Sequence, residues 1–146
     1  MTHWILIADA SGARIFSSTP LGAQVQLLRE LPNPEGRKRN QELVTDEPGR
    51  LFSSGSPGTR SGTERKVTAH DEAADRFAHT LADLLYKELE HKAYDTLSIV
   101  APPHFLGTLR PLLVKEVSRH LSKTETKDVA DMPIHELRSY LQTLLG

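Results

Sequence analysis

The 146-residue chain contains no cysteine, which excludes disulfide bonds and thiolate metal sites. It also lacks an excess of charge of either sign, since 18 Lys and Arg stand against 19 Asp and Glu, a formal net charge of -1. Charge therefore does not draw the whole chain to nucleic acid or to a membrane, and any basic site must be local. Near the start, the apolar run of residues 4–8 is too short for a signal peptide or a membrane span. We expect a cytoplasmic protein with no membrane-spanning segment.

Several motifs of known chemistry are also missing. The chain has no Gly-x-Ser-x-Gly nucleophile elbow and no Gly-x-x-x-x-Gly-Lys-Ser/Thr phosphate loop. Among its seven histidines, none forms a His-Glu-x-x-His pair. The sequence therefore predicts no metal site and no cofactor. What remains is an ordinary globular composition, 38% hydrophobic and 25% charged, with a length suited to a single domain over residues 1–146.

The first third of the chain predicts an antiparallel meander of three strands. Residues 4–8 form a nearly continuous apolar run, as expected of a central strand buried on both faces. The sequence Asp-Ala-Ser-Gly at residues 9–12 favours a tight turn, and residues 13–17 predict a second strand in a hairpin with the first. Residues 24–31 alternate imperfectly and predict the third strand.

The second half predicts strands and helices in alternation. Residues 97–101 are a short, apolar, β-branched run ended by two prolines, which indicates a buried strand and a rigid turn. Apolar residues then recur at helical spacing, namely Leu106, Leu109, Leu113 and Val117. We also expect helices at about 68–91 and from residue 131 onward, and a polar edge strand at 124–129. The predicted order is β-β-β-loop-α-β-α-β-α, an α/β fold with a mixed sheet and helices on its faces.

Between the meander and the first helix, residues 32–67 predict a long, mobile loop. The segment is rich in Gly, Pro, Ser, Arg and Asn, and loops beyond about 12–15 residues are usually functional or disordered. Positive charge on such a segment attracts RNA phosphates without sequence preference. The candidate RNA-binding residues are Arg37, Lys38, Arg39, Arg50, Arg60, Arg65 and Lys66. The alternative is a solvated loop, because five acidic residues lie among them and Phe52 is the segment's only aromatic residue.

Three segments together resemble a known bacterial family. They are residues 4–14 (Trp-Ile-Leu-Ile-Ala-Asp-Ala-Ser-Gly-Ala-Arg), residues 99–107 (Ile-Val-Ala-Pro-Pro-His-Phe-Leu-Gly), and the pair Lys127-Asp128-Val129 and Pro133-Ile134-His135-Glu136-Leu137. They are similar to the host-attachment family, the proteins required for attachment to host cells. The resemblance covers nearly the whole chain, and Ala-Pro-Pro-x-Phe-Leu-Gly is its most specific part.

The resemblance implies a fold and an ancestry. The family is similar in turn to the middle domain of archaeal and eukaryotic peptide-chain release factors, within a ribonuclease-H-like group of mixed sheets. In those factors, the loop equivalent to residues 32–67 carries a Gly-Gly-Gln tip that positions water for peptidyl-tRNA hydrolysis on the ribosome. That tip is absent here, where Gln41 follows Asn40. The resemblance therefore implies a release-factor-like fold and a ribosome-facing ancestry, without the residues of the release reaction.

Two residues are candidates for catalysis. Asp9 ends the first predicted strand, where ribonuclease-H-type nucleases bind a catalytic metal; alternatively it closes the turn at residues 9–12 through its own backbone. His104 follows the two prolines at the carboxyl end of the strand predicted at residues 97–101, where ligands of α/β sheets usually lie. Its side chain is suited to acid or base chemistry. Alternatively it caps that turn. For both residues the structural interpretation is the favoured one.

Three hypotheses about function follow. The first is a non-catalytic protein that binds RNA or the ribosome through its basic loop. The second is a protein-interaction factor that supports attachment to host cells. The third is an enzyme, either a metal-dependent nuclease using Asp9 or a hydrolase using His104. A homodimer is also open, because edge strands of such a sheet can pair between chains.

Overall fold

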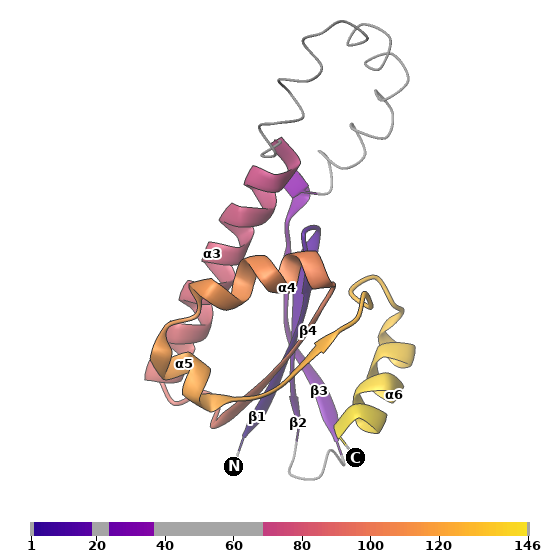
Figure 1. Ribbon diagram of the computed structural model, residues 1–146. Helices are drawn as coiled ribbons and strands as arrows, with labels where there is room; N and C mark the ends of the chain where they lie inside the picture. Colours follow the sequence, from indigo (N-terminus) through magenta and orange to yellow (C-terminus); the bar gives the residue numbers. More distant parts are fainter. Residues whose placement is uncertain (1, 19–23, 37–68, 146) are drawn as a thin grey trace, which may run out of the picture.

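Five strands form one mixed sheet with helices on both faces (Figure 1). The computed structural model describes residues 2–18, 24–36 and 69–145. The α/β class and the order of elements confirm the sequence prediction. The elements are β1 (His3–Asp9), β2 (Gly12–Ser18), β3 (Val25–Pro32), α3 (Ala69–Glu90), β4 (Thr96–Ala101), α4 (Pro103–Leu109), the 3-10 helix η2 (Arg110–Leu112), α5 (Lys115–His120), β5 (Leu121–Thr126) and α6 (Ile134–Leu145).

Strand β1 is the centre of the sheet, whose order is β3-β2-β1-β4-β5. It pairs antiparallel with β2 and parallel with β4, while β3 and β5 form the two edges. Successive side chains of a strand point to opposite faces. Trp4 and Leu6 therefore enter the core on one face, and Ile5 and Ile7 enter a second core on the other. Burial on both faces explains why this run is continuously apolar.

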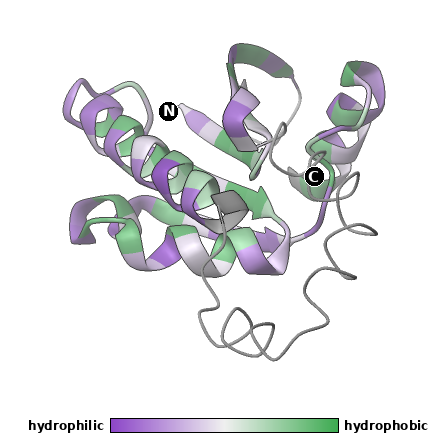
Figure 2. Ribbon diagram, turned by 90° about the horizontal axis from the view of Figure 1, so that it is seen from above, coloured by the Kyte–Doolittle hydropathy of each residue, from purple (hydrophilic) through white to green (hydrophobic). Residues whose placement is uncertain are grey.

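The larger core lies between the sheet and helices α3, α4 and α5. Helix α3 contributes Phe77, Leu81 and Leu85, which recur every four residues and form its buried stripe. The ring of Phe77 lies 6.1 Å, centroid to centroid, from that of Phe105 in α4. Seen from above, α3 alternates between hydrophobic and hydrophilic residues along its length (Figure 2). That alternation is typical of a helix with one face in a core and the other in water.

The smaller core lies on the opposite face of the sheet, beneath α6 (Figures 1 and 2). Leu137 and Leu141 of α6 are fully buried there with Ile5, Ile7 and Phe16 of the sheet. Val129, in the connection between β5 and α6, belongs to the same cluster. The connection is therefore held against the sheet at the point where it passes the end of β1.

Two predicted boundaries were wrong. The last strand spans Leu121–Thr126 and not 124–129, because β5 is a polar edge strand that is positioned by its pairing with β4, with Leu121 opposite Leu97. The helix predicted after β4 is interrupted, since Pro111 lies in η2 and Leu113 is extended. All four apolar residues predicted for that helix are nevertheless buried, namely Leu106, Leu109, Leu113 and Val117.

Candidate functional site

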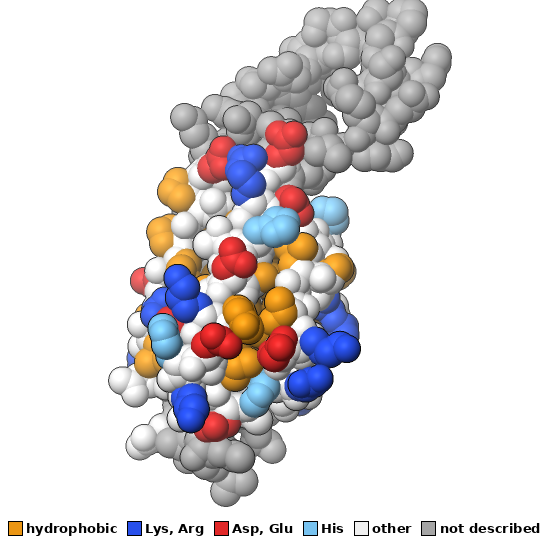
Figure 3. Space-filling view, turned by 90° about the vertical axis from the view of Figure 1, so that its left-hand side faces the viewer, with side chains coloured by type: hydrophobic (Ala, Val, Ile, Leu, Met, Phe, Trp, Pro, Cys, Tyr) orange, Lys and Arg blue, Asp and Glu red, His pale blue; other side chains and the backbone are white. Residues whose placement is uncertain are grey.

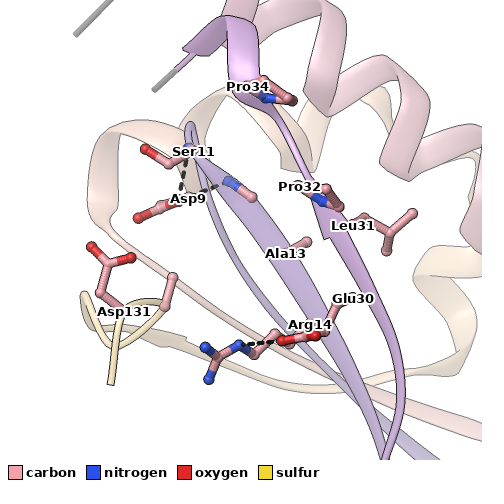
Figure 4. A pocket seen from close by; sticks show the side chains of 11 residues that line it. Asp9, Ser11, Ala13, Arg14, Glu30, Leu31, Pro32, Pro34 and Asp131 are labelled. Atoms are coloured by element: carbon pink, nitrogen blue, oxygen red, sulfur yellow. Dashed lines mark hydrogen bonds and ion pairs between the residues drawn. The ribbon is translucent and has the colours of Figure 1, made fainter. Parts of the chain in front are cut away.

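A pocket of about 360 Å³ lies at the end of the sheet where β1, β2 and β3 meet the connection between β5 and α6 (Figure 4). This volume falls in the range of small-molecule sites, roughly 300–1,000 Å³. The carboxyl ends of β1 and β3 and the start of β2 supply most of the wall. The lining residues are Asp9, Ser11, Gly12, Ala13, Arg14, Glu30, Leu31, Pro32, Pro34, Ala130 and Asp131.

Asp9 closes the hairpin between β1 and β2 and also lines this pocket. Its Oδ1 accepts hydrogen bonds from the backbone N–H groups of Ser11, at 2.8 Å, and Gly12, at 3.2 Å. An aspartate that binds its own backbone in this way stabilises a tight turn. The turn-closing interpretation is thus confirmed, and a catalytic role for Asp9 stays a prediction.

The surroundings of Asp9 disfavour its charged form. Burial raises the pKa of the Asp9 carboxyl above its usual 3.8, and the nearby negative charges of Asp131 and Asp128 raise it further. The hydrogen bonds from the Ser11 and Gly12 backbone act in the opposite direction. Asp9 therefore lies in a partly desolvated, acidic environment at the pocket wall.

Arg14 is held in place by two other lining segments. Its Nη1 donates to the backbone carbonyl of Met132 at 2.9 Å, and its Nε lies 3.4 Å from Glu30 Oε2. The first contact ties β2 to the connection between β5 and α6, and the second ties it to β3. Arg14 thus forms the lower wall of the pocket in Figure 4. Its positive charge is partly balanced by Glu30 and by the Met132 carbonyl.

Residues 33–36 continue from β3 across the hairpin turn. The backbone N–H of Asn33 donates to Ser11 O at 2.9 Å, and Asn33 Nδ2 donates to Ala10 O at 2.8 Å. Glu35 forms an ion pair of 2.7 Å with Arg76 of α3. The first residues of the predicted loop are therefore part of the folded domain. Asn33 binds the hairpin turn at the pocket rim, and Glu35 binds α3.

Of the other predicted site residues, only His104 is among those that the structure describes. His104 lies exposed in the first turn of α4, where its carbonyl accepts a hydrogen bond from Thr108 at 3.1 Å, and it is not part of the lining. The predicted RNA-binding residues all lie outside the described residues, and these are Arg37, Lys38, Arg39, Arg50, Arg60, Arg65 and Lys66. Between the two predicted site residues that the structure describes, Asp9 lines the pocket and His104 does not.

Sequence reasoning missed Arg14, Glu30 and Asp131 as pocket residues. Arg14 carried a usable signal, because a charged residue inside an apolar strand needs a partner when it is partly buried. Its partners are distant in sequence, since Met132 follows 118 residues later. Only the strand pairing brings these groups together.

Two features are absent from the residues that the structure describes. Among residues 2–18, 24–36 and 69–145, no three His, Cys, Asp or Glu side chains are grouped so as to hold a metal ion. No helix in these same ranges is long and apolar enough to cross a membrane.

Comparison with solved structures returns similar folds of low sequence identity. One, described as an archaeal protein, matches 97% of this chain at 14% identity with a TM-score of 0.45. Another, the archaeal translation termination factor aRF1, matches 99% at 13% identity with a TM-score of 0.42. The chain covers 36% of each of these structures. An archaeal release factor is thus among the solved structures to which the chain is weakly similar.

Comparison with protein families is more specific. No curated protein matches the chain significantly. A family model described as "Protein required for attachment to host cells" matches residues 4–141, which run from the second residue of β1 into α6. This family match suggests a role in attachment to host cells. The chain belongs to the family of proteins required for attachment to host cells, as residues 4–14 and 99–107 indicated from sequence.

Proposed function

We propose that this protein is a non-catalytic, cytoplasmic member of the family that binds RNA or the ribosome through residues 32–67. The distribution of charge carries the proposal. The segment holds seven Lys and Arg against five Asp and Glu, a net charge of +2, whereas the rest of the chain is net acidic at -3. Attraction to phosphates by such a local basic segment needs no overall positive charge.

Two features of the described residues support this proposal. Residues 33–36 are held by Asn33 and Glu35, and the triplet Arg37-Lys38-Arg39 follows directly in sequence. On the face formed by α3 and α5, acidic and basic side chains are interspersed around a small hydrophobic group (Figure 3). A mixed surface of that kind attracts phosphates weakly, so the segment is the better candidate for the contact.

Alanine substitution of the basic triplet tests the proposal. The Arg37→Ala, Lys38→Ala, Arg39→Ala variant should bind ribosomes and structured RNA more weakly, by a similar factor for all RNA sequences. The matched control removes three exposed cations elsewhere, Lys115, Arg119 and Arg138 of α5 and α6. Equal loss in both variants would point to general charge, and no loss in the triplet variant would remove the segment as the contact.

A second candidate is a protein-interaction factor that acts directly in attachment, which the family description favours. The location of the protein in the cell distinguishes this candidate from the RNA proposal. Fractionation that finds part of the protein at the cell surface supports direct attachment, whereas a purely cytosolic pool supports the RNA proposal and an indirect role.

The enzyme hypothesis also has a direct test, motivated by the position of Asp9 in the pocket wall. Nuclease and esterase assays of the purified protein would be compared with the variants Asp9→Asn and His104→Ala. Nuclease activity lost in Asp9→Asn would support catalysis and the ribonuclease-H-like ancestry that the sequence resemblance implies, and esterase activity lost in His104→Ala would support a hydrolase. An activity that survives both would come from elsewhere.

A further inference from the structure

Strand β5 forms one edge of the sheet and pairs on one side only, with β4. Among the described residues no other strand lies beside it, and Figure 1 shows it running between α5 and the connection to α6 with no other element in front of it. The backbone groups on the outer side of an edge strand are open to a further strand. β5 therefore offers a surface on which a strand can add to the sheet.

The ladder between β4 and β5 determines which backbone groups of β5 point outward. After an irregularity at its start, the register is regular over Lys123–Thr126. Lys127 N continues the ladder and donates to Ala101 O at 2.9 Å, so the backbone groups of Lys127 point toward β4. Along a strand, these groups point to one side and to the other in alternate residues. The N–H and C=O of Thr124 therefore point away from β4, toward the open edge.

Two opposite charges lie on the face of β5 that is turned toward α6. Glu125 is paired with Val100, which belongs to the smaller core beneath α6. Lys123 lies two residues away and so on the same face, where its Nζ lies 3.4 Å from the Leu144 carbonyl oxygen. An ammonium group has three donors, and this long contact leaves others for a carboxylate. Lys123 is exposed and Glu125 is partly exposed, so both can meet groups beyond the edge.

A second copy of β5 complements this arrangement when the two strands run antiparallel about Thr124. Thr124 then faces Thr124 of the second copy, and because its backbone groups point outward, the two residues exchange both hydrogen bonds. Lys123 faces Glu125 of the second copy, and Glu125 faces its Lys123. Directly opposite residues lie on one face of an antiparallel pair, so both ion pairs form on the α6 side. Opposite charges and paired threonines are favourable cross-strand neighbours.

The other edge of the sheet is less suited to pairing. Strand β3 has a bulge in its register with β2 and ends in Pro32, which has no N–H to donate. Arg29 of β3 is bound to Glu88 of α3 at 2.9 Å. Bulges, prolines and charged side chains are features that keep an edge strand from pairing. In β5 the irregularity lies before Lys123–Thr126, and the two charges of that segment complement a second copy of themselves.

We propose that β5 is a dimerisation edge, at which two copies of this chain pair antiparallel about Thr124 and are held in register by ion pairs between Lys123 and Glu125. The two five-stranded sheets then form one continuous sheet. One short strand buries little surface, so the dimer is weak and depends on protein concentration. The proposal goes beyond RNA binding and involves none of residues 32–67, so either can fail without the other.

Sedimentation equilibrium of the full chain over a range of concentrations measures the dimer. Lys123→Glu or Glu125→Lys alone places like charges opposite one another at two positions, and each should weaken the dimer about tenfold or more. The double variant restores opposite charges and should dimerise like the wild type. An equimolar mixture of the two single variants should form a mixed dimer, because one copy then presents two acids and the other two bases. Recovery in the mixture also shows that both single variants fold.

Two control variants make the test specific. Lys87→Glu and Asp83→Lys make the same changes of charge at exposed positions of α3 and should leave the dimer unchanged. As a second measurement, hydrogen exchange of the Thr124 amide should slow as the wild-type concentration rises, and should not slow in either single variant of β5. The proposal is overturned by a chain that stays monomeric at every concentration, by single variants of β5 that dimerise as tightly as the wild type, or by a mixture of these two variants that does not dimerise.

Discussion

Asp9 Oδ1 lies 2.8 Å from the backbone nitrogen of Ser11 and accepts its hydrogen bond. This one contact joins the fold to the candidate site, because the same carboxyl group closes the β1–β2 hairpin and lines the pocket. Substitutions at residue 9 can therefore separate the turn-closing role from the role of the charge.

The first prediction compares Asp9→Asn with Asp9→Ala. Asparagine keeps an oxygen that accepts from Ser11 and Gly12, and it removes a carboxylate that burial and its acidic neighbours disfavour. At neutral pH we expect Asp9→Asn to match or exceed the wild type in free energy of unfolding. Asp9→Ala should lose about 1–2 kcal/mol, because two backbone donors lose their partner. Urea unfolding measures both, and equal destabilisation by the two variants would contradict the assignment.

The pH dependence of that comparison has a defined sign. Since the folded-state pKa of Asp9 is raised above 3.8, its contribution to stability is fully present below 3.8 and is lost as the pH rises through the folded pKa. The advantage of asparagine over aspartate should therefore grow across this window and stay constant at higher pH. Unfolding curves for both proteins over the acidic range measure it.

The second prediction concerns two glycines with different surroundings. A Cβ at Gly36 would overlap the carbonyl oxygen of Ala10 and lie 2.8 Å from Asn33 Nδ2, whereas a Cβ at Gly107 would meet nothing within 4 Å. Gly36→Ala should cost about 1–3 kcal/mol, because the backbone must shift away from the hairpin turn. Gly107→Ala, within α4, should stabilise by up to about 1 kcal/mol through helix propensity. Thermal unfolding of the pair checks this, and a harmless Gly36→Ala would show that residue 36 does not pack on the turn.

The third prediction tests the buried hydroxyl of Tyr94. It donates to the Leu85 carbonyl at 2.7 Å, and its ring lies 5.0 Å from that of Trp4. Tyr94→Phe should cost about 1–2 kcal/mol, because the buried carbonyl loses its donor. The control Tyr86→Phe, at a 37% exposed position, should stay within about 0.5 kcal/mol of the wild type.

The ionisation of the Tyr94 hydroxyl should also be visible as a separate step in an alkaline titration. Burial raises the pKa of its hydroxyl to about 12. In the ultraviolet titration of the folded protein, the Tyr94→Phe variant should therefore lack the most alkaline step. Loss of an earlier step would mean that Tyr94 is more accessible than its 1% exposure indicates.

The fourth prediction concerns His3, whose ring joins β1 to β4. Its Nδ1 lies 2.6 Å from the Thr96 hydroxyl and its Nε2 lies 2.9 Å from that of Ser98. Burial lowers the pKa of His3 below 6.5, so its contribution to stability is present above pH 6.5 and is lost as the pH falls through the folded pKa. The His3→Gln variant should lose less stability than the wild type over that window. Parallel curves for the two proteins would contradict the assignment.

Much of the fold followed from short patterns. The run Trp4–Ala8 is apolar at every position because β1 is covered on both faces, so its burial could be predicted from composition alone. By contrast, β5 has the sequence Leu-Ser-Lys-Thr-Glu-Thr, which carries no hydrophobic signal. Only its pairing with β4 determines where it begins. The interrupted helix was missed because the spacing of Leu109 and Leu113 stays helical across Pro111.

The candidate site was less predictable than the fold. Asp9 could be found because Asp-Ala-Ser-Gly is a local turn signal. Arg14, Glu30 and Asp131 lie on three separate segments, and no local pattern says that a sheet and a connection bring them together. Sites assembled from distant segments need the topology first.

The most direct test of the central proposal is binding of the purified protein to ribosomes and to a generic structured RNA across a range of salt concentrations. We predict that the logarithm of the affinity falls linearly with the logarithm of the salt concentration, and that the Arg37, Lys38 and Arg39 alanine variant lowers the slope by about one for each lost phosphate contact. Absence of binding even at low salt, or a slope that the variant leaves unchanged, would contradict RNA binding through residues 32–67.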